Sequence, residues 1–272
     1  MSAGTAGTSN CLTLSLVRDF ELRNSNAFID VPPTAQRLIG FLALQGPRSV
    51  RRSLVSGTLW LDATETRANA SLRSAIWRSP VLADGPLVLA SNTHVWLRED
   101  VQVDLHTAIG LARSMLDAPA LDPTMIDLDH ELSWFTEDIL VGWYDDWLLL
   151  ERERFRQLRL HVLDQCGELL LRAHRYSEAV QVGLLAVASE PLRESAHRLL
   201  VRAHLCEGNL AEALRQYRGY ADLLDLELGV RPSAAMDDLI SGALAGASTT
   251  EWASAPRKSS IASHLSRPTA SA

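Results

Sequence analysis

An internal repeat of 34 residues limits the folds that are open to the second half of the chain. The first copy contains Leu171, Tyr176, Glu178, Ala179 and Val180, and the second contains Leu205, Leu210, Glu212, Ala213 and Leu214. A period of about 34 residues, with alanine where two helices lie close together, is typical of stacked helix-turn-helix units. Pro191 stands between the two copies, where a helix must stop. The repeat therefore predicts a stack of helix pairs.

This spacing is that of the tetratricopeptide repeat. We expect Trp147–His174 to supply the preceding helix and Pro232–Leu244 to cap the end of a helical domain at 106–245. After Gly246 the composition turns to Ser, Thr, Ala and Pro, which predicts a disordered tail at 246–272. Residues 1–11 are expected to form a flexible N-terminus.

The first part of the chain has a different pattern. Short β-type runs occupy Leu12–Val17, Phe20–Leu22 and Ala27–Val31, with a turn at Asn24, Ser25 and Asn26. Helices are expected at Thr34–Leu44, Arg51–Trp60 and Glu65–Ser79, before a hairpin of Leu87–Ala90 and Val95–Leu97. A small sheet, three helices and a hairpin are the order of a winged helix-turn-helix with an extra N-terminal sheet. We place this DNA-binding domain at 12–105, with its third helix in the major groove.

The third predicted helix has a narrow apolar face, formed at about 100° per residue by Ala68, Leu72, Ala75 and Ile76. The opposite face has three guanidinium groups, two hydroxyls and no acid, and it consists of Thr66, Arg67, Ala70, Arg73, Ser74, Trp77 and Arg78. Arg73 lies mid-face and is the candidate for a base contact, because guanidinium matches guanine O6 and N7. Arg67 and Arg78 lie nearer the ends and are candidates for phosphate contacts, and Thr66 and Ser74 suit either role.

Several of these assignments have a structural alternative. The three arginines of an isolated helix would suit a merely solvated face, and their place before a wing favours DNA. Trp77 suits a wedge against the sugar and backbone, and it equally suits packing against the wing. Arg51 and Arg52 suit either a flanking phosphate or simple surface exposure. Asn92, Thr93 and His94 form the predicted wing tip, which suits contact with the DNA backbone or minor groove and equally suits no contact.

The distribution of charge permits nucleic-acid binding although the net charge is −7. Residues 1–105 carry ten Arg against nine acids, and the remainder carries sixteen basic and twenty-four acidic residues. Within Arg48–Arg78 there are six Arg and two acids. Because phosphate attraction acts within about a Debye length of ~10 Å, a locally basic stripe is sufficient. The asymmetry also indicates two domains with different tasks.

The sequence argues against several classes of protein. No apolar run approaches the ~18 residues that a membrane helix needs, and the first ten residues have no secretory signal pattern. Three widely spaced cysteines, Cys11, Cys166 and Cys206, indicate reduced thiols in a cytoplasmic protein, with the latter two on buried helix faces. His130-Glu131 lacks the second histidine of a zinc helix, and no nucleophile elbow is present. We therefore expect no enzyme, no metal site and no cofactor.

Two clusters in the helical half invite a structural interpretation. Trp134, Trp143, Tyr144 and Trp147 are crowded together, and aromatics at this density usually form a core or an inter-domain seam rather than a ligand cage. Glu151–Arg159 alternates in charge, which predicts exposed helix faces with intrahelical ion pairs.

Over residues 12–244 the chain resembles the short Streptomyces antibiotic regulatory proteins, which activate secondary-metabolite gene clusters in actinomycetes. The motifs that carry the resemblance are SLRSAIWR at 71–78, GWYDDW at 142–147, ERERFRQLR at 151–159, PLRESAHR at 191–198, Gly208-Asn209, ALRQY at 213–217 and ELGV at 227–230, with Val103-Asp104-Leu105 at the domain exit. The resemblance implies an α+β OmpR-like winged helix-turn-helix followed by an all-α, tetratricopeptide-like bacterial transcriptional activation domain.

The same resemblance implies a function. The protein would bind direct repeats in promoter DNA as two protomers, contact the sigma and alpha subunits of RNA polymerase, and lie in the cytoplasm on the nucleoid. Two features depart from the family: Ser79 and Pro80 shorten the third helix, and no phosphate-binding loop supports an ATPase module. The alternative function is a protein-interaction scaffold whose winged helix binds protein instead of DNA.

Overall fold

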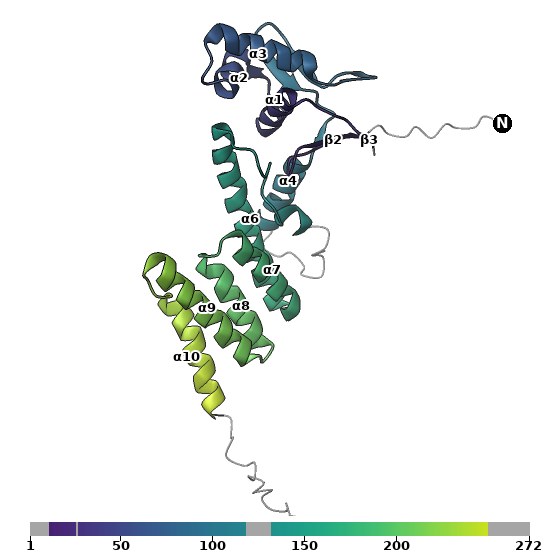
Figure 1. Cartoon of the computed structure of the whole chain (residues 1–272). Coiled ribbons are helices and arrows are strands. Elements are labelled where there is room, and N and C mark those ends of the chain that lie inside the picture. The colour runs from purple at the N-terminus through teal and green to yellow at the C-terminus, as the bar shows by residue number, and fades with distance from the viewer. Residues whose placement is uncertain (1–10, 26, 118–131, 250–272) are drawn as a thin grey trace, which may run out of the picture.

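The computed structural model describes residues 11–25, 27–117 and 132–249 of the 272-residue chain. Its helices are α1 Pro33–Leu44, α2 Arg52–Leu59, α3 Glu65–Arg78, α4 Asp104–Asp117, the short 3-10 helix Leu132–Phe135, α6 Asp146–Arg172, α7 Tyr176–Ser189, α8 Glu194–Cys206, α9 Leu210–Leu228 and α10 Ala234–Thr249. Its strands are β1 Leu12–Ser15, β2 Glu21–Asn24, β3 Ala27–Phe28, β4 Val50–Arg51, β5 Val81–Leu82, β6 Gly85–Pro86, β7 Val88–Ala90, β8 His94–Leu97 and β9 Gln102–Val103. A region with α1–α3 lies at one end, and α7–α10 form a stack at the other (Figure 1).

The N-terminal sheet has the order β3-β2-β1-β9. In β1 the buried Leu12 and Leu14 alternate with less buried polar residues, as a strand with one face on the core requires. β9 runs parallel to β1, with Val103 opposite Leu14. This fourth strand was not predicted, because two residues carry too little pattern to mark a strand whose partner lies far away in the sequence.

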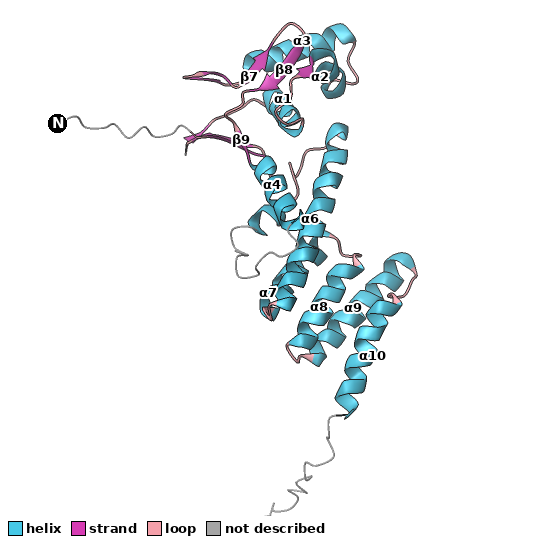
Figure 2. Cartoon of the chain, turned by 180° about the vertical axis from the view of Figure 1, so that it is seen from behind, coloured by secondary structure: helices cyan, strands magenta, loops and turns pink. Residues whose placement is uncertain are grey.

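The three following helices pack with a second sheet of order β4-β8-β7 (Figure 2). Their shared core includes the fully buried Leu38 of α1, Val55 of α2 and Leu72 of α3. The arrangement is compatible with a winged helix-turn-helix. α3 matches the predicted helix to within one residue: Ser79 is its C-cap, and Pro80 follows in a position that disfavours continuation.

Pairing between distant strands corrects the prediction around the hairpin. Arg51 belongs to β4 and lies opposite His94 of β8, so α2 begins at Arg52 and His94 is part of a strand rather than of the tip. A further two-stranded hairpin, β5-β6, separates α3 from β7, in a segment for which the sequence predicts no strand.

The helical half confirms the repeated helix pairs. α7 and α9 begin at Tyr176 and Leu210, one 34-residue period apart. Ala179 and Ala213 are both fully buried at equivalent positions, where a small side chain lets neighbouring helices approach. A methyl group added at Gly183 would lie 2.7 Å from Leu200 Cδ2, so α7 and α8 also require the absence of a side chain there.

Two predicted boundaries differ from the structure. α10 continues to Thr249, so residues 246–249 are helical and do not belong to a disordered tail. Met236 and Ile240 anchor this helix against α9, and the alanines that follow favour continuation. α4 begins at Asp104, which places the expected boundary at 105/106 inside its first turn. The rest of the predicted tail and the first ten residues lie outside the described ranges.

The expected aromatic seam is confirmed for two tryptophans. Trp147 meets Phe41 of α1 edge to face at a centroid distance of 5.3 Å, and Trp143 stacks on Phe20 at 6.1 Å. Trp134 is half-buried and packs against the same core. Tyr144 differs, because it is 92% exposed just before the first turn of α6. The ring cluster thus joins α1 to the start of α6.

Polar contacts reinforce the same junction. The Arg37 Nε of α1 donates to Asp145 Oδ1 at 2.9 Å, and its Nη2 donates to the Leu59 carbonyl at 3.1 Å. The Leu140 amide donates to the Leu16 carbonyl at 2.8 Å, so the segment before α6 continues the pairing of β1. None of the helices in the described ranges is long and apolar enough to cross a membrane.

The charged stretch at the start of α6 is confirmed in part. Arg154 and Arg156 form intrahelical ion pairs with Glu151 and Glu153 at 2.7 and 3.0 Å. Arg159 is not exposed as expected: its exposed fraction is 5%, and its Nε has no hydrogen-bond partner among the described residues. Burial lowers the pKa of its guanidinium, while the nearby Asp138 acts in the opposite direction. Cys166 is buried as predicted, whereas Cys206, the last residue of α8, is exposed.

Candidate nucleic-acid interface

α3 presents its basic face to solvent. Ala68, Leu72 and Ala75 are buried against α1 and α2, and Ile76 is half-buried at the edge of that contact. All seven residues of the opposite face are exposed: Thr66, Arg67, Ala70, Arg73, Ser74, Trp77 and Arg78. The helical phase predicted from the apolar positions is therefore confirmed, and it determines which side chains face outward.

The three arginines of this face have no protein partner in the described part of the chain. Arg67, Arg73 and Arg78 form no ion pair and no side-chain hydrogen bond with any described residue. Glu65 is the acid of the first turn, and it lies at the end of the helix. Unpaired guanidinium groups in a row produce a local positive potential that attracts phosphate.

A second group of candidates gathers around the start of α2. Arg51, Arg52, Asn92, Thr93 and His94 line a surface hollow of about 410 Å³ together with Ser53. The Arg52 amide donates to the Thr93 carbonyl at 2.9 Å, and its Nη1 donates to the Ser91 carbonyl at 3.3 Å. These contacts hold the turn between β7 and β8 against the N-terminus of α2, where backbone N–H groups favour an anion. The sequence placed these residues in two separate segments, and the fold brings them together.

Trp77 does not pack against the wing. Its side chain is 84% exposed at the last turn of α3, and Val81 of β5, directly beyond, is 75% exposed. Two large apolar side chains in water at the end of a basic helix suit a nucleic-acid backbone or a base edge. Val81 was not among the predicted candidates, because the β5-β6 hairpin that presents it was not expected. Arg48, which is exposed beside β4, was counted in the basic stripe without a role.

Arg98 shows what a structural arginine looks like in the same region. Its guanidinium donates to Asp84 at 2.7 Å and to Asp100 at 2.5 Å, and its side chain is only 13% exposed. These hydrogen bonds lower the pKa of both carboxyl groups and raise the pKa of Arg98. Arg98 is thus neutralised locally, and it ties the β5-β6 turn to the end of β8. Among the described residues no cluster of His, Cys, Asp and Glu has the makings of a metal site.

A sequence model of the bacterial transcriptional activator domain matches residues 103–244. The chain is 28% identical over 217 residues to the regulatory protein AfsR of Streptomyces coelicolor. The matched region covers 76% of this chain and 21% of AfsR. It is also 28% identical over 225 residues to AfsR of Streptomyces griseus. That match covers 80% of this chain and 23% of the S. griseus protein. The chain therefore spans about a fifth of the length of the curated relatives it matches.

The fold has a counterpart among solved structures. The chain is similar to Mycobacterium tuberculosis EmbR in complex with a low-affinity phosphopeptide, with a TM-score of 0.71 and 16% sequence identity. The superposition covers 87% of this chain and 65% of that one. The shared architecture therefore extends beyond the residues that the family model matches and includes most of the β-rich region.

Proposed function

We propose that this chain binds promoter DNA in a sequence-specific manner through the exposed face of α3. The chain belongs to the bacterial transcriptional activator domain family, and it is a transcriptional regulator of the Streptomyces antibiotic regulatory protein type. The single observation that carries the proposal is the row of three unpaired, exposed arginines on a helix whose other side is buried in the three-helix core. A helix held in this way is rigid enough to enter a major groove.

The exposed residues take different roles in this proposal. Arg73 stands at mid-face and reads a guanine, while Arg67 and Arg78 hold phosphates on either side. Thr66 and Ser74 add hydrogen bonds, and Ala70 leaves room for close approach. Around the start of α2, Arg51, Arg52, Asn92, Thr93 and His94 grip the adjacent backbone, and the N-terminus of α2 faces a phosphate.

The finer parts of the proposal rest on family membership. We infer an OmpR-like winged helix-turn-helix at 12–105 and an activation domain from there to about residue 245. Two protomers bind direct repeats in a promoter of a secondary-metabolite gene cluster, and the helical stack contacts the sigma and alpha subunits of RNA polymerase. The ion-paired surface of α6–α9 supports a protein-binding rather than a DNA-binding role for that half.

The test is a footprint of the full chain on the promoters beside its own gene, followed by fluorescence anisotropy with the protected fragment. We expect Arg73→Ala to weaken binding by about 1–3 kcal/mol, roughly 5- to 150-fold, and to relax specificity at one position. Arg218→Ala is the matched control, because Arg218 is exposed on α9 and has no ion pair with any described residue.

The outcome also separates the alternative scaffold function. DNA binding through α3 requires an affinity that falls linearly with salt on logarithmic axes, and an Arg73→Ala loss that Arg218→Ala does not share. If both variants bind the promoter as tightly as the parent chain, α3 is not the reading helix. The scaffold function, in which this face meets a protein, would then be preferred.

A further inference from the structure

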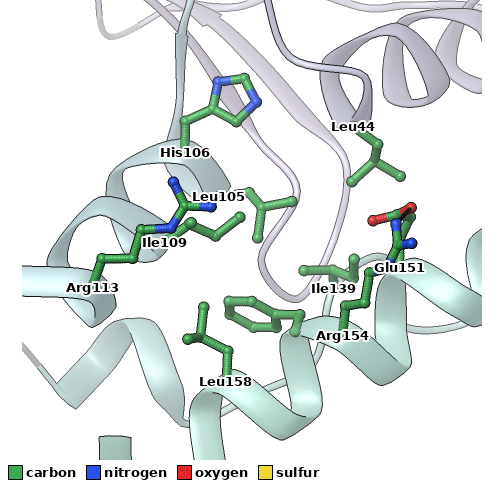
Figure 3. Close-up of a pocket in the computed structure, with 10 residues that line it drawn as sticks. Leu44, Leu105, His106, Ile109, Arg113, Ile139, Glu151, Arg154 and Leu158 are labelled. Carbon is green, nitrogen blue, oxygen red and sulfur yellow. Dashed lines mark hydrogen bonds and ion pairs between the residues drawn. The ribbon is translucent and has the colours of Figure 1, made fainter. Parts of the chain in front are cut away.

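A cavity of about 440 Å³ lies where the β-rich region meets the helical half (Figure 3). Four elements line it: the end of α1, the first three turns of α4, the segment before α6, and α6 itself. Its lining residues are Leu44, Leu105, His106, Ile109, Arg113, Ile139, Glu151, Arg154, Phe155 and Leu158. The volume lies within the range of about 300–1,000 Å³ that small-molecule sites occupy.

The chemistry of the lining is divided between an apolar floor and a charged rim. Six of the ten side chains are aliphatic or aromatic, and Leu105, Ile139 and Phe155 are buried. In Figure 3, Arg113 on α4 and the Arg154–Glu151 pair on α6 lie on opposite sides of the apolar side chains. An apolar cavity with a few polar groups at its mouth suits a ligand with an apolar body and a polar head.

Among the described residues that line the rim, one positive charge is unbalanced. Arg154 Nη1 lies 2.7 Å from Glu151 Oε1, so these two charges cancel. The Nε2 of His106 donates to the Ala43 carbonyl at 2.8 Å, which occupies the ring with a structural contact. Arg113 has neither an ion pair nor a side-chain hydrogen bond within the described ranges. A guanidinium at an apolar mouth is the natural partner of a carboxylate, which it binds with two parallel hydrogen bonds.

We propose that this cavity binds a small amphipathic monocarboxylate, with its apolar body on Ile109, Phe155 and Leu158 and its carboxylate on Arg113. A compact inorganic anion would leave the apolar floor wet, and a neutral apolar molecule would leave Arg113 unmatched. A cationic ligand would meet a rim that is already positive. The site is separate from the DNA interface, and its existence does not depend on the proposed function.

The position of the site links ligand binding to the junction between the two halves. Leu44 is the last residue of α1, the helix against which α3 packs, and His106 holds α4 to the carbonyl of Ala43. A ligand in this cavity contacts α1, α4 and α6 together. It therefore stabilises the junction in the arrangement in which all three line the site.

The experiment is isothermal titration calorimetry of the full chain with decanoate, and with 1-decanol as the uncharged counterpart. Arg113→Gln removes the cation while keeping a polar, uncharged side chain, and Ile109→Trp fills the cavity. Arg218→Gln is the matched control on an exposed arginine of α9. We expect one decanoate per chain, an affinity about tenfold lower in Arg113→Gln, no change in Arg218→Gln, and 1-decanol binding that Arg113→Gln leaves unchanged.

Ile109→Trp is expected to abolish binding of both compounds, with circular dichroism showing that the variant is folded. If Ile109→Trp is unfolded, the decanoate affinity of Arg113→Gln tests the proposal alone. The Arg113 side chain is exposed, so its replacement leaves the core intact. The proposal is overturned if the parent chain takes up no decanoate at millimolar concentration. It is equally overturned if Arg113→Gln and Arg218→Gln bind decanoate as tightly as the parent.

Discussion

Helices α3 and α6 both carry several arginines, and they place them in opposite electrostatic settings. On α3 the guanidinium groups of Arg67, Arg73 and Arg78 are exposed and have no acidic partner within the described residues. On α6, Arg154 and Arg156 each meet a glutamate three residues earlier, at 2.7 and 3.0 Å. The number of arginines is therefore a poor sign of a nucleic-acid surface. The acids at neighbouring helical positions are the better sign.

The same contrast holds across the helical stack. Arg193 at the start of α8 donates to Asp164 of α6 at 2.7 Å, and Arg202 of α8 pairs with Glu168 of α6. These pairs join helices that are not neighbours in sequence, so they contribute to the stability of the stack. Arginines of α3 have no such role. Substitutions in the two regions should consequently change different measurements.

The largest effect on stability is expected from Asp164→Ala. Asp164 accepts from both Arg193 and Ser195, and the ion pair is only about a quarter exposed, with side-chain exposures of 23% and 26%. Its loss leaves Arg193 without its acidic partner, with only the Ser195 hydroxyl as acceptor, and should lower the free energy of unfolding by about 1–3 kcal/mol. Urea denaturation followed by circular dichroism measures this change. Promoter affinity should remain that of the parent chain.

Asp222→Ala supplies the comparison for that measurement, since Asp222 is exposed on α9 and has no ion pair in the part of the chain that the structure describes. Its effect should stay within about 0.5 kcal/mol. Equal destabilisation by the two substitutions would show that the inter-helix pair contributes nothing beyond a surface charge. The contrast between α3 and the stack would then lose its energetic basis.

A second effect should appear on acidification. His197 is buried on α8, its Nε2 donates to the Pro191 carbonyl at 2.8 Å, and its Nδ1 accepts from Gln216 at 2.8 Å. Burial lowers the pKa of this imidazole. The unfolded chain then binds a proton near the ordinary pKa of about 6.5, before the folded chain does. The free energy of unfolding should therefore fall as the pH drops below about 6.5, until the pH passes the folded pKa.

Urea titrations of the parent chain, His197→Gln and His161→Gln over this pH range measure that loss. His161, which is exposed on α6, is the histidine used as the control substitution. His197→Gln should reduce the acid dependence, whatever its effect at neutral pH. An identical acid slope in all three proteins would assign the pH dependence to other groups.

The smallest effect on stability is expected on α3. Arg78→Ala removes an exposed, unpaired side chain, so the free energy of unfolding should change by no more than about 0.5 kcal/mol. The same substitution should reduce the slope of log affinity against log salt for promoter DNA by about 1, because one phosphate contact is lost. Anisotropy titrations at several salt concentrations measure the slope. An unchanged slope would remove Arg78 from the interface while leaving Arg73 to be judged separately.

Local signals were sufficient to predict α3 and the exposure of its basic face. The apolar period sets the helical phase, and Pro80 sets the end, so both depend on neighbouring residues alone. The 34-residue repeat could also be predicted from the sequence, because the alanines at the close helix–helix contacts recur with the same period. DNA contact by any of these residues remains a prediction.

Features that depend on distant partners were missed. Strands β4, β5, β6 and β9 have two residues each, and pairing across the fold defines them. Arg159 has the same sequence surroundings as its ion-paired neighbours, yet it is buried. In the sequence, Tyr144 and Trp147 belong to the same aromatic cluster. In the structure α6 begins between them at Asp146, and Tyr144 is exposed while Trp147 packs against Phe41 of α1. The cavity around Arg113 is formed by four elements that are far apart in the sequence, so no local motif predicts it.

A single cluster of buried apolar residues runs from Leu14 of β1 through Leu42 of α1 and Phe155 of α6 to Leu199 of α8. Because this core is shared, the described parts of the β-rich region and the helical half are expected to unfold together. Removing the helices would expose Phe41 and its neighbours to water and invite aggregation. The smaller cluster around Tyr220 and Met236 is separate, so local opening is expected to begin at α10 and to leave α3 in place.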